Sequence, residues 1–485
     1  MSSLVALFIV AATIVGAIAF GFLVVRKITM SPRELVVGDR SFGPILLCVL
    51  FAGEALTSFA FLGVPGWAYA KGAPAFYVLP YSCLGMIVLF AFGPLVWRRA
   101  RELNCLTNAD YFASIYQSDL LGLLVAVCGI FFLVLYITVQ LTGIQILLEL
   151  AGYGSVKNVT AGAIAFFLIM LFVFSTGLRG VAWVSLVKDV LVFGAILFAG
   201  AVIPIQFLGS PLHLFTRLRE TYPDWLTLRS GTMPNGTVWF VSTVLVNGFG
   251  ALTWPHAVAG AIYSAKDEAS IRRNAMIVPF YILILVFVLL AGFSALLLMP
   301  GLKGDDTDQS FMRVVQTHYP AWVLGAMAGA GCLAALVPCS AMMLAAGSLF
   351  ARNIVAIFSR SFAEKEGTAL IRISVVIVST LAFVSWATAR GTLVSMLLVA
   401  TNGATQFLPG ILLSFRSRRP PALSIGTGLV VSLLFLCWTA AIRLPVVSGI
   451  NVGLAALLLN FLVVGVVTLA ASKRQPAEVA DREQV

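Results

Sequence analysis

The chain has 485 residues, of which 60% are hydrophobic, and its formal net charge is +11. A mean hydropathy of +1.01 is far above that of a soluble domain and is typical of a polytopic membrane protein. The Lys and Arg residues gather in alternate loops, a pattern of cytoplasmic loops rather than of a nucleic-acid-binding surface. The seven cysteines form no CxxC pair, so we expect neither disulfides nor a metal centre.

Apolar stretches follow one another from the first residues almost to the last. Windows of roughly 19 residues predict about thirteen transmembrane helices, and therefore an all-α integral membrane fold. The first span, 3–25, is followed rather than preceded by a basic pair, Arg26-Lys27, so we expect a retained anchor helix instead of a cleaved signal peptide. The basic loops predict that the N-terminus lies outside and the C-terminus inside.

The second span, 44–69, combines an apolar sequence with features that oppose a continuous helix. Gly53, Gly63 and Pro65 favour a break, and Glu54 puts a carboxyl group at mid-span. Non-helical backbone is tolerated at membrane depth only where it is buried in protein or lines a cavity. An intramembrane acid is by default a functional hypothesis, so this stretch is expected to lie at a site.

A second stretch of this kind runs from Asn247 to His256. Its Phe-Gly-Ala-Leu-Thr at 249–253 echoes Gly-Glu-Ala-Leu-Thr at 53–57, five spans earlier. Paired broken helices in matching positions are a sequence pointer to a transporter binding site. The spacing predicts a 5+5 inverted-repeat core with two broken helices. The predicted parts are an anchor helix and cytoplasmic loop at 1–43, repeats at 44–208 and 237–415, an extracellular loop at 209–236, and two peripheral helices with a cytoplasmic tail at 416–485.

Polar side chains inside other spans have more than one interpretation. Tyr136 and Gln140 share a helix face, as substrate contacts or as interhelical hydrogen-bonding groups. Lys188 and Asp189 are adjacent on the sixth span and point about 100° apart, so we expect them not to pair with each other. Lys188 is expected to extend to the membrane interface, while Asp189 has either a mechanistic role or another partner.

Two further segments carry structural expectations. The ninth span, 321–351, is rich in Gly and Ala, which predicts close helix packing, and we expect an interruption at Pro338. The acidic loop 300–308 lacks the length and the terminal acid of an EF-hand, so it is interpreted as a solvated loop rather than a calcium site.

Several short motifs resemble the sodium/solute symporter family across nearly the whole chain. They are Gly63-Val-Pro-Gly-Trp-Ala-Tyr69, Trp254-Pro-His256 and Gln406-Phe-Leu-Pro-Gly410. The segments 53–55, 187–189, 300–304, 335–338 and 349–353 are similar to the bacterial monocarboxylate permease branch. The resemblance implies a symporter of the bacterial inner membrane that works by alternating access. It implies no enzyme activity, no nucleic-acid partner and no cofactor beyond the coupling ion, Na⁺ or H⁺.

The resemblance also implies a sodium site made by the first broken helix and the ninth span. Its ligands would be the carbonyls of Gly53, Leu56 and Ala335. The family's two hydroxyl positions are here Pro338 and Cys339, with Ser340 next. Proline has no side-chain oxygen and a thiol is a poor ligand for a hard cation, so this sequence departs from the family at the sodium site.

A proton is the alternative coupling ion. Glu54 and Asp189 are candidate carriers because burial disfavours a charged carboxylate, although Glu54 is equally interpreted as a structural acid bonded to hydroxyls or amides. His256 is either another carrier or a ring that caps the unwound segment or faces the cytoplasm. Cys339 and Ser340 belong to the same candidate coupling region.

The substrate site is expected at mid-membrane between the second, fourth, seventh and eleventh spans. The candidate contacts are Asn247 and Thr401, followed by Thr57, Tyr136, Gln140, Thr405 and Gln406. This modest polar set suits a small monocarboxylate of the lactate, pyruvate or propionate type. The alternative is Na⁺-coupled uptake of an amino acid or another organic anion. A channel would need a continuous polar lining, and an enzyme a catalytic cluster, and the sequence shows neither pattern.

Overall fold

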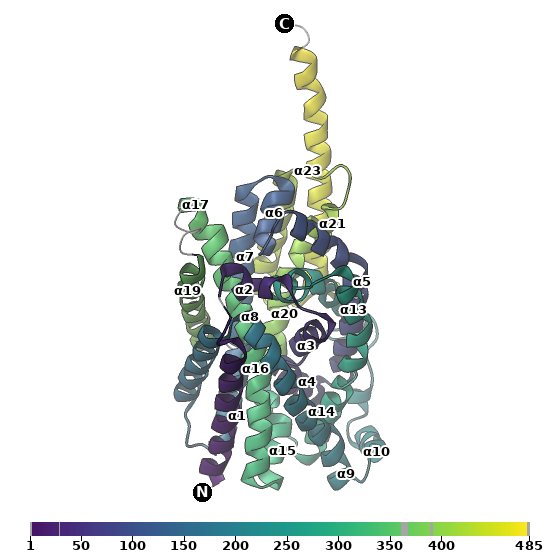
Figure 1. Cartoon of the computed structure of the whole chain (residues 1–485). Helices are drawn as coiled ribbons and strands as arrows, with labels where there is room; N and C mark the ends of the chain where they lie inside the picture. The colour runs from purple at the N-terminus through teal and green to yellow at the C-terminus, as the bar shows by residue number, and fades with distance from the viewer. Residues whose placement is uncertain (1, 29, 360–366, 389–390, 483–485) are drawn as a thin grey trace.

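The computed structural model describes residues 2–28, 30–359, 367–388 and 391–482. Within these ranges the side chains of Glu54, Asn158, Ser175 and residues 473–482 are not described. The described chain is almost entirely helical, and its two ends lie at opposite ends of the bundle (Figure 1). The helices are α1 (Ser2–Val25), α2 (Pro32–Val37), α3 (Pro44–Ala55), α4 (Val64–Lys71), α5 (Val78–Glu102), α6 (Asn108–Tyr116), α7 (Asp119–Ala151), α8 (Asn158–Leu197), α9 (Ile203–Leu208), α10 (Pro211–Thr221), α11 (Thr237–Phe249), α12 (Pro255–Ala257), α13 (Glu268–Ile282), α14 (Leu285–Leu298), α15 (Ser310–His318), α16 (Ala321–Leu349), α17 (Ala356–Phe358), α19 (Gly367–Thr388), α20 (Leu393–Ala404), α21 (Leu408–Leu413), α22 (Ala422–Ala441) and α23 (Val452–Arg482). A short hairpin, β1 (Val446–Val447) and β2 (Ile450–Asn451), joins α22 to α23.

The helices have the length and composition of a multi-pass membrane protein. In the described part of the chain, 10 helices are long and apolar enough to cross a membrane. The bent pair Thr237–Leu252 and Pro255–Tyr263, whose halves meet at 43°, is an eleventh candidate if the pair is one span. Pro44–Gly53 and Val159–Phe174 are shorter apolar helices. The all-α membrane fold is confirmed, while the exact number of spans and their orientation stay predictions.

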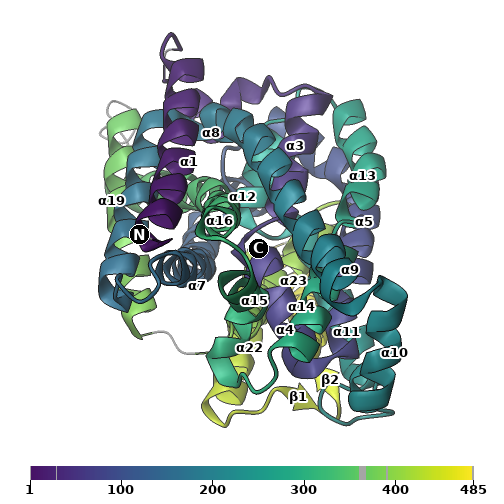
Figure 2. The ribbon, with the colours of Figure 1, turned by 90° about the horizontal axis from the view of Figure 1, so that it is seen from below.

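Helix α16 forms the centre of the bundle. In its most apolar window 94% of the residues are buried, because α1, α7, α8 and α19 pack around it (Figure 2). A Cβ at Gly331 would lie 2.6 Å from the ring of Phe61, so the predicted close packing of small residues is confirmed. The expected interruption at Pro338 is wrong, since α16 continues through it. Proline removes one helical hydrogen bond, and the helices packed on every side hold the remaining turns.

Both predicted broken helices are present, and the shared Ala-Leu-Thr sequence lies at each break. Helix α3 ends at Ala55, and a π-helical segment begins at Phe59 before α4. In the second copy a 3-10 turn ends at Leu252 and α12 begins at Pro255. The two threonines that follow the leucines, Thr57 and Thr253, are fully buried. The unwound backbone is thus enclosed by protein, as membrane depth requires.

Helix α8 runs through the predicted span 159–176 and into the predicted span 183–208, and it bends at Gly177. This glycine has φ +58° and ψ −177°, a backbone conformation that is essentially restricted to glycine. Two residues after Gly177, the guanidinium of Arg179 forms an ion pair of 2.5 Å with the buried Glu34 of α2. The bend therefore joins the two spans without an intervening loop.

The acidic loop is not solvated throughout, which corrects the interpretation from sequence. Asp305 and Asp306 are exposed, but Asp308 is only 2% exposed. Its carboxylate accepts a hydrogen bond of 2.7 Å from the backbone N–H of Leu393. Asp308 thus caps the first turn of α20, a contact between positions 85 residues apart, which local composition does not reveal.

Candidate functional site

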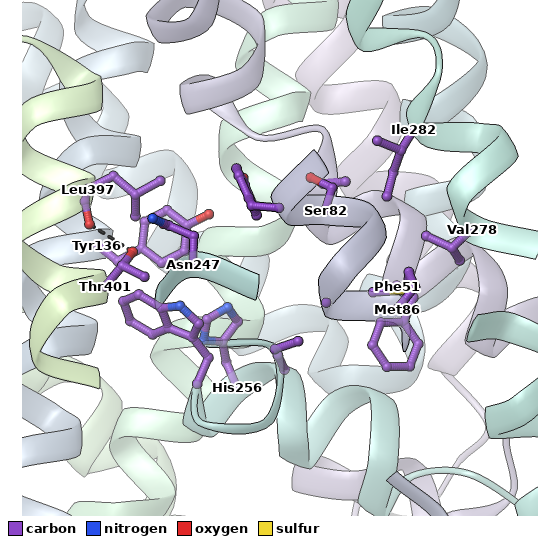
Figure 3. A pocket seen from close by; sticks show the side chains of 16 residues that line it. Phe51, Ser82, Met86, Tyr136, Asn247, His256, Val278, Ile282, Leu397 and Thr401 are labelled. Atoms are coloured by element: carbon purple, nitrogen blue, oxygen red, sulfur yellow. Dashed lines mark hydrogen bonds between the residues drawn. The ribbon is translucent and has the colours of Figure 1, made fainter. Parts of the chain in front are cut away.

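A cavity of about 150 Å³ lies beside both broken helices. Six elements contribute to its wall: α3, α5, α7, the break between α11 and α12, α13 and α20 (Figure 3). The lining residues are Phe51, Ala55, Tyr81, Ser82, Gly85, Met86, Tyr136, Asn247, Ala251, Trp254, His256, Ala257, Val278, Ile282, Leu397 and Thr401.

Three rings form one side of the cavity. Tyr136 of α7 lies 5.1 Å from Trp254 and 5.7 Å from His256, measured between ring centroids, and Trp254 and His256 are 5.5 Å apart. Trp254 has extended backbone, with φ −66° and ψ 120°, so the break itself turns these side chains toward α7. His256 is 3% exposed. It lies in the cavity wall (Figure 3) rather than at a cytoplasmic surface.

The polar groups of the wall are amide, hydroxyl, indole and imidazole groups. Asn247 donates from Nδ2 to the Thr243 carbonyl at 2.8 Å, which leaves its second N–H and its Oδ1 for other partners. The hydroxyls of Thr401 and Ser82 donate to carbonyls of their own helices at 2.9 and 2.7 Å, and each oxygen keeps lone pairs that accept hydrogen bonds. The described lining residues include no Asp, Glu, Lys or Arg. Such a wall can orient a small polar solute against an apolar surface.

Of the seven predicted substrate contacts, Tyr136, Asn247 and Thr401 line this cavity. Gln140 is instead placed at the first break, where its Oε1 accepts hydrogen bonds from Ser58 N at 3.2 Å and from Ser58 Oγ at 2.8 Å. Gln140 thus joins α7 to the unwound segment.

The other three predicted contacts, Thr57, Thr405 and Gln406, do not line the cavity. Thr57 is fully buried at the break. Thr405 donates to the Thr401 carbonyl at 2.8 Å and approaches the Val246 carbonyl at 3.3 Å. Gln406 donates to carbonyls of α20 and of Gly453. Their contact with a substrate stays a prediction.

Lys188 and Asp189 contradict both expectations made for them. Lys188 is fully buried and does not reach the membrane interface. Its Nζ donates to the carbonyl of Gly53 at 2.8 Å and lies 3.0 Å from Oδ1 of Asp189, so the two neighbours do form an ion pair. The expectation considered only the angle of about 100° between adjacent helix positions. The four-carbon stem of lysine is long and flexible, so the ammonium group reaches back to the adjacent carboxylate.

The residues at the expected sodium position do not fit sodium. The Gly53 carbonyl already accepts the Lys188 ammonium group. On α16, Pro338 offers no side-chain oxygen, Cys339 presents a buried thiol, and Ser340 donates its hydroxyl to the Leu336 carbonyl at 2.8 Å. Ala335 and Leu56 supply at most backbone carbonyls to a hard cation that requires several oxygens. The side chain of Glu54 lies outside the described part of the structure, so its role in coupling stays a prediction.

The contributions of α5 and α13 to the cavity wall were not predicted from the sequence. Tyr81, Ser82 and Met86 lie on a span whose sequence shows no break and no recognised motif. The one available signal was Tyr81-Ser82, a polar pair in an otherwise apolar helix. Small residues support the placement, because a Cβ at Gly85 would lie 3.2 Å from Cβ of Ala251 at the second break.

Two broken helices, a mid-bundle cavity between them and a tightly packed central helix define a secondary transporter rather than an enzyme. The fold is shared with a Na⁺-coupled sialic acid symporter solved in a substrate-bound outward-open state. The alignment covers 95% of each chain with a TM-score of 0.76 and 15% sequence identity. A family model of the sodium:solute symporter family matches residues 35–421. The chain belongs to that family.

Curated bacterial relatives support the assignment. The uncharacterized symporter YhjB of Bacillus subtilis is 34% identical over 97% of this chain and 98% of its own length. A monocarboxylate transport permease protein of Rhizobium johnstonii is 30% identical over 66% of this chain and 64% of its own. The sodium/proline symporter of Escherichia coli is 21% identical over 87% of this chain and 85% of its own.

Proposed function

We propose that this symporter takes up a small monocarboxylate of the lactate, pyruvate or propionate type by alternating access, driven by a Na⁺ or H⁺ gradient. The observation that carries the proposal is the size and chemistry of the cavity. A volume of about 150 Å³ is that of a cavity which holds benzene, a molecule of roughly six heavy atoms. Lactate and pyruvate are of this size. The name of the Rhizobium relative, a monocarboxylate transport permease, points the same way.

The proposed contacts divide between the two ends of such a solute. Asn247 has an uncommitted N–H for the carboxylate, and the Tyr136 hydroxyl lies on the same side of the cavity (Figure 3). Thr401 can accept from a hydroxyl group of the solute. Phe51, Met86 and other apolar residues face the methyl end. No lysine or arginine among the described lining residues holds the anion, which favours its release.

An amino acid is the second candidate, since proline symporters are among the relatives. Its ammonium group requires acceptors, which Asn247 Oδ1 and the Thr401 oxygen can supply. A fixed carboxylate would serve better, and none is present among the described lining residues. This difference favours the monocarboxylate and makes competition between the two classes a direct test.

The test is uptake of labelled propionate, pyruvate, lactate and proline into proteoliposomes, with sodium and pH gradients imposed separately. We expect saturable monocarboxylate uptake that excess proline does not inhibit. Thr401→Val removes a hydroxyl from the cavity and should raise the KM for lactate about fivefold, the effect of one hydrogen bond of about 1 kcal/mol.

Thr427→Val is the matched control. Thr427 makes the same bond to the carbonyl four residues earlier, at 2.7 Å, but is half-buried on α22 and does not line the cavity. Its KM should equal that of the wild type. Proline uptake that excess lactate leaves unchanged, with no monocarboxylate uptake, would refute the proposal. Uptake that saturates without any gradient would show a uniporter instead.

A further inference from the structure

We infer that the ammonium group of Lys188 serves as a built-in cation at the position where the family resemblance implies sodium, so that this chain does not bind sodium there. The inference deepens the proposed symport function and rests on it for its mechanistic meaning. Three helices carry the residues that support it. Helix α8 carries the lysine, and α3 ends at the first break. Helix α16 has Pro338 and Cys339 at the two positions where the resemblance implies hydroxyl groups.

The ammonium group of Lys188 lies at the end of the first half of the broken helix. Nζ of Lys188 lies 2.8 Å from the Gly53 carbonyl oxygen, within the last turn of α3 before the break. The ammonium group occupies one lone-pair direction of that oxygen, and its positive charge repels a sodium ion that would bind the same oxygen from the other side. The lysine is fully buried, and its charge is therefore enclosed by the bundle rather than shared with water.

The charge of Lys188 is balanced within the bundle. A buried ammonium group requires a partner, because an isolated charge is expensive to bury. Asp189 provides it at 3.0 Å and is itself almost fully buried. The other titratable groups packed around the pair are Tyr281 of α13, whose hydroxyl lies beside the Asp189 carboxylate, and Cys48 of α3. Glu54 follows Gly53 in the chain.

Gly53 has a steric role at this contact. A Cβ at this position would lie 2.9 Å from the Lys188 Nζ and 3.4 Å from the Ser185 hydroxyl oxygen. Glycine thus leaves room for the ammonium group to reach the carbonyl. At Pro338 and Cys339, where the resemblance implies hydroxyl ligands, the chain supplies no side-chain oxygen, so a free cation would also lack these ligands.

The mechanistic meaning lies in what the contact connects. Lys188 bridges α8, which packs on the central α16, to α3, one half of a broken helix. A cation at this place ties the broken helix to the rest of the bundle. Here the cation is the side chain of a residue of α8, so the contact between α8 and α3 does not depend on the sodium concentration.

Lys188→Ala provides the sharpest test. It removes Cγ, Cδ, Cε and Nζ, the four heavy atoms of n-propylammonium, and leaves the Asp189 carboxylate and the Gly53 carbonyl facing an empty space. The purified full-length wild type and the variant are heated in detergent in equal concentrations of sodium chloride, choline chloride and n-propylammonium chloride. This readout requires no substrate, so it remains valid even if the proposed monocarboxylate is wrong.

We expect the wild type to have the same apparent Tm in sodium and in choline. Lys188→Ala should melt at a lower temperature in choline, and propylammonium should recover most of the loss. Sodium should stabilise the variant more than the wild type, because the unpaired carboxylate attracts it. Lys157→Met, which removes an exposed lysine before α8, is the control and should behave as the wild type.

Sodium stabilisation of the wild type that equals or exceeds that of Lys188→Ala would overturn the inference. So would a variant whose Tm in choline matches the wild type, or one that propylammonium leaves unchanged. If Lys188→Ala does not fold, Lys188→Met replaces it, because methionine keeps most of the side-chain volume and removes the charge. Sodium should then raise the Tm of Lys188→Met, relative to choline, more than that of the wild type, and an equal or smaller effect would overturn the inference.

Discussion

The buried carboxyl group of Asp308 makes the stability of this protein depend on pH in a direction opposite to that of most aspartates. Burial raises the pKa of Asp308 from 3.8 to about 8, although the hydrogen bond from the Leu393 N–H opposes the shift. In the unfolded chain the pKa returns to about 4. Between these two values the native state holds a proton that the unfolded state has released, so its stability is full below about pH 4 and is lost as the pH rises toward 8.

The size of the effect follows from the linkage relation. One proton difference changes the free energy of unfolding by about 1.4 kcal/mol per pH unit. From about pH 5 to about pH 7 the Asp308 contribution should therefore fall by about 3 kcal/mol. Asp308→Asn keeps an oxygen that accepts from Leu393 N–H and has no proton to release. The variant should lack this part of the pH dependence.

Equilibrium unfolding in mixed micelles of SDS and a mild detergent measures the free energy at each pH. The difference in slope between the wild type and Asp308→Asn isolates the Asp308 contribution, because all other titrating groups are common to both. Asp306→Asn is the control. Asp306 lies in the same turn but is exposed, so Asp306→Asn should keep the loss of stability between about pH 5 and about pH 7 that Asp308 produces. Parallel curves for the wild type and Asp308→Asn would refute the reasoning.

Two backbone features give further predictions. Gln140→Met leaves the buried N–H of Ser58 without its acceptor and should lower the free energy of unfolding by about 1–3 kcal/mol; an unchanged value in the same unfolding assay would show that Gln140 does not hold the break. Gly177→Ala places a side chain at φ +58° and should cost about 1–3 kcal/mol. Gly194→Ala, in a helical part of α8 with no atom within 4 Å of the new Cβ, should instead be neutral or stabilising, and equal losses for the two glycines would contradict this account of the bend.

Sequence analysis predicted those parts of the fold that depend on local chemistry. Glycine and proline at 53–66 and 247–256 oppose a continuous helix wherever they occur, so both breaks were predictable. The small residues of α16 likewise predict close helix packing. This packing keeps α16 continuous through Pro338, the proline that had suggested an interruption. The division into repeats at 44–208 and 237–415 rests on the spacing of the breaks and stays a prediction.

The missed features depend on contacts between distant positions. Lys188 and Gly53 are separated by 135 residues, and no periodicity shows that a lysine on one helix will reach the end of another. The same holds for Asp308 and Leu393, and for α5, whose share of the cavity wall follows from its packing against the second break. Asn247 and Thr401 were predicted because they lie within matched motifs, and Tyr136 because it is a polar residue on the same helix face as Gln140.

A cryo-EM structure of the purified chain with pyruvate in sodium-containing buffer tests the account most directly. The account predicts density for pyruvate between Tyr136, Asn247 and Thr401, with the Lys188 ammonium group on the Gly53 carbonyl and no ion beside it. An empty cavity with pyruvate bound elsewhere would contradict the proposed substrate site. An ion at the Gly53 carbonyl, with Lys188 turned away, would contradict the built-in cation.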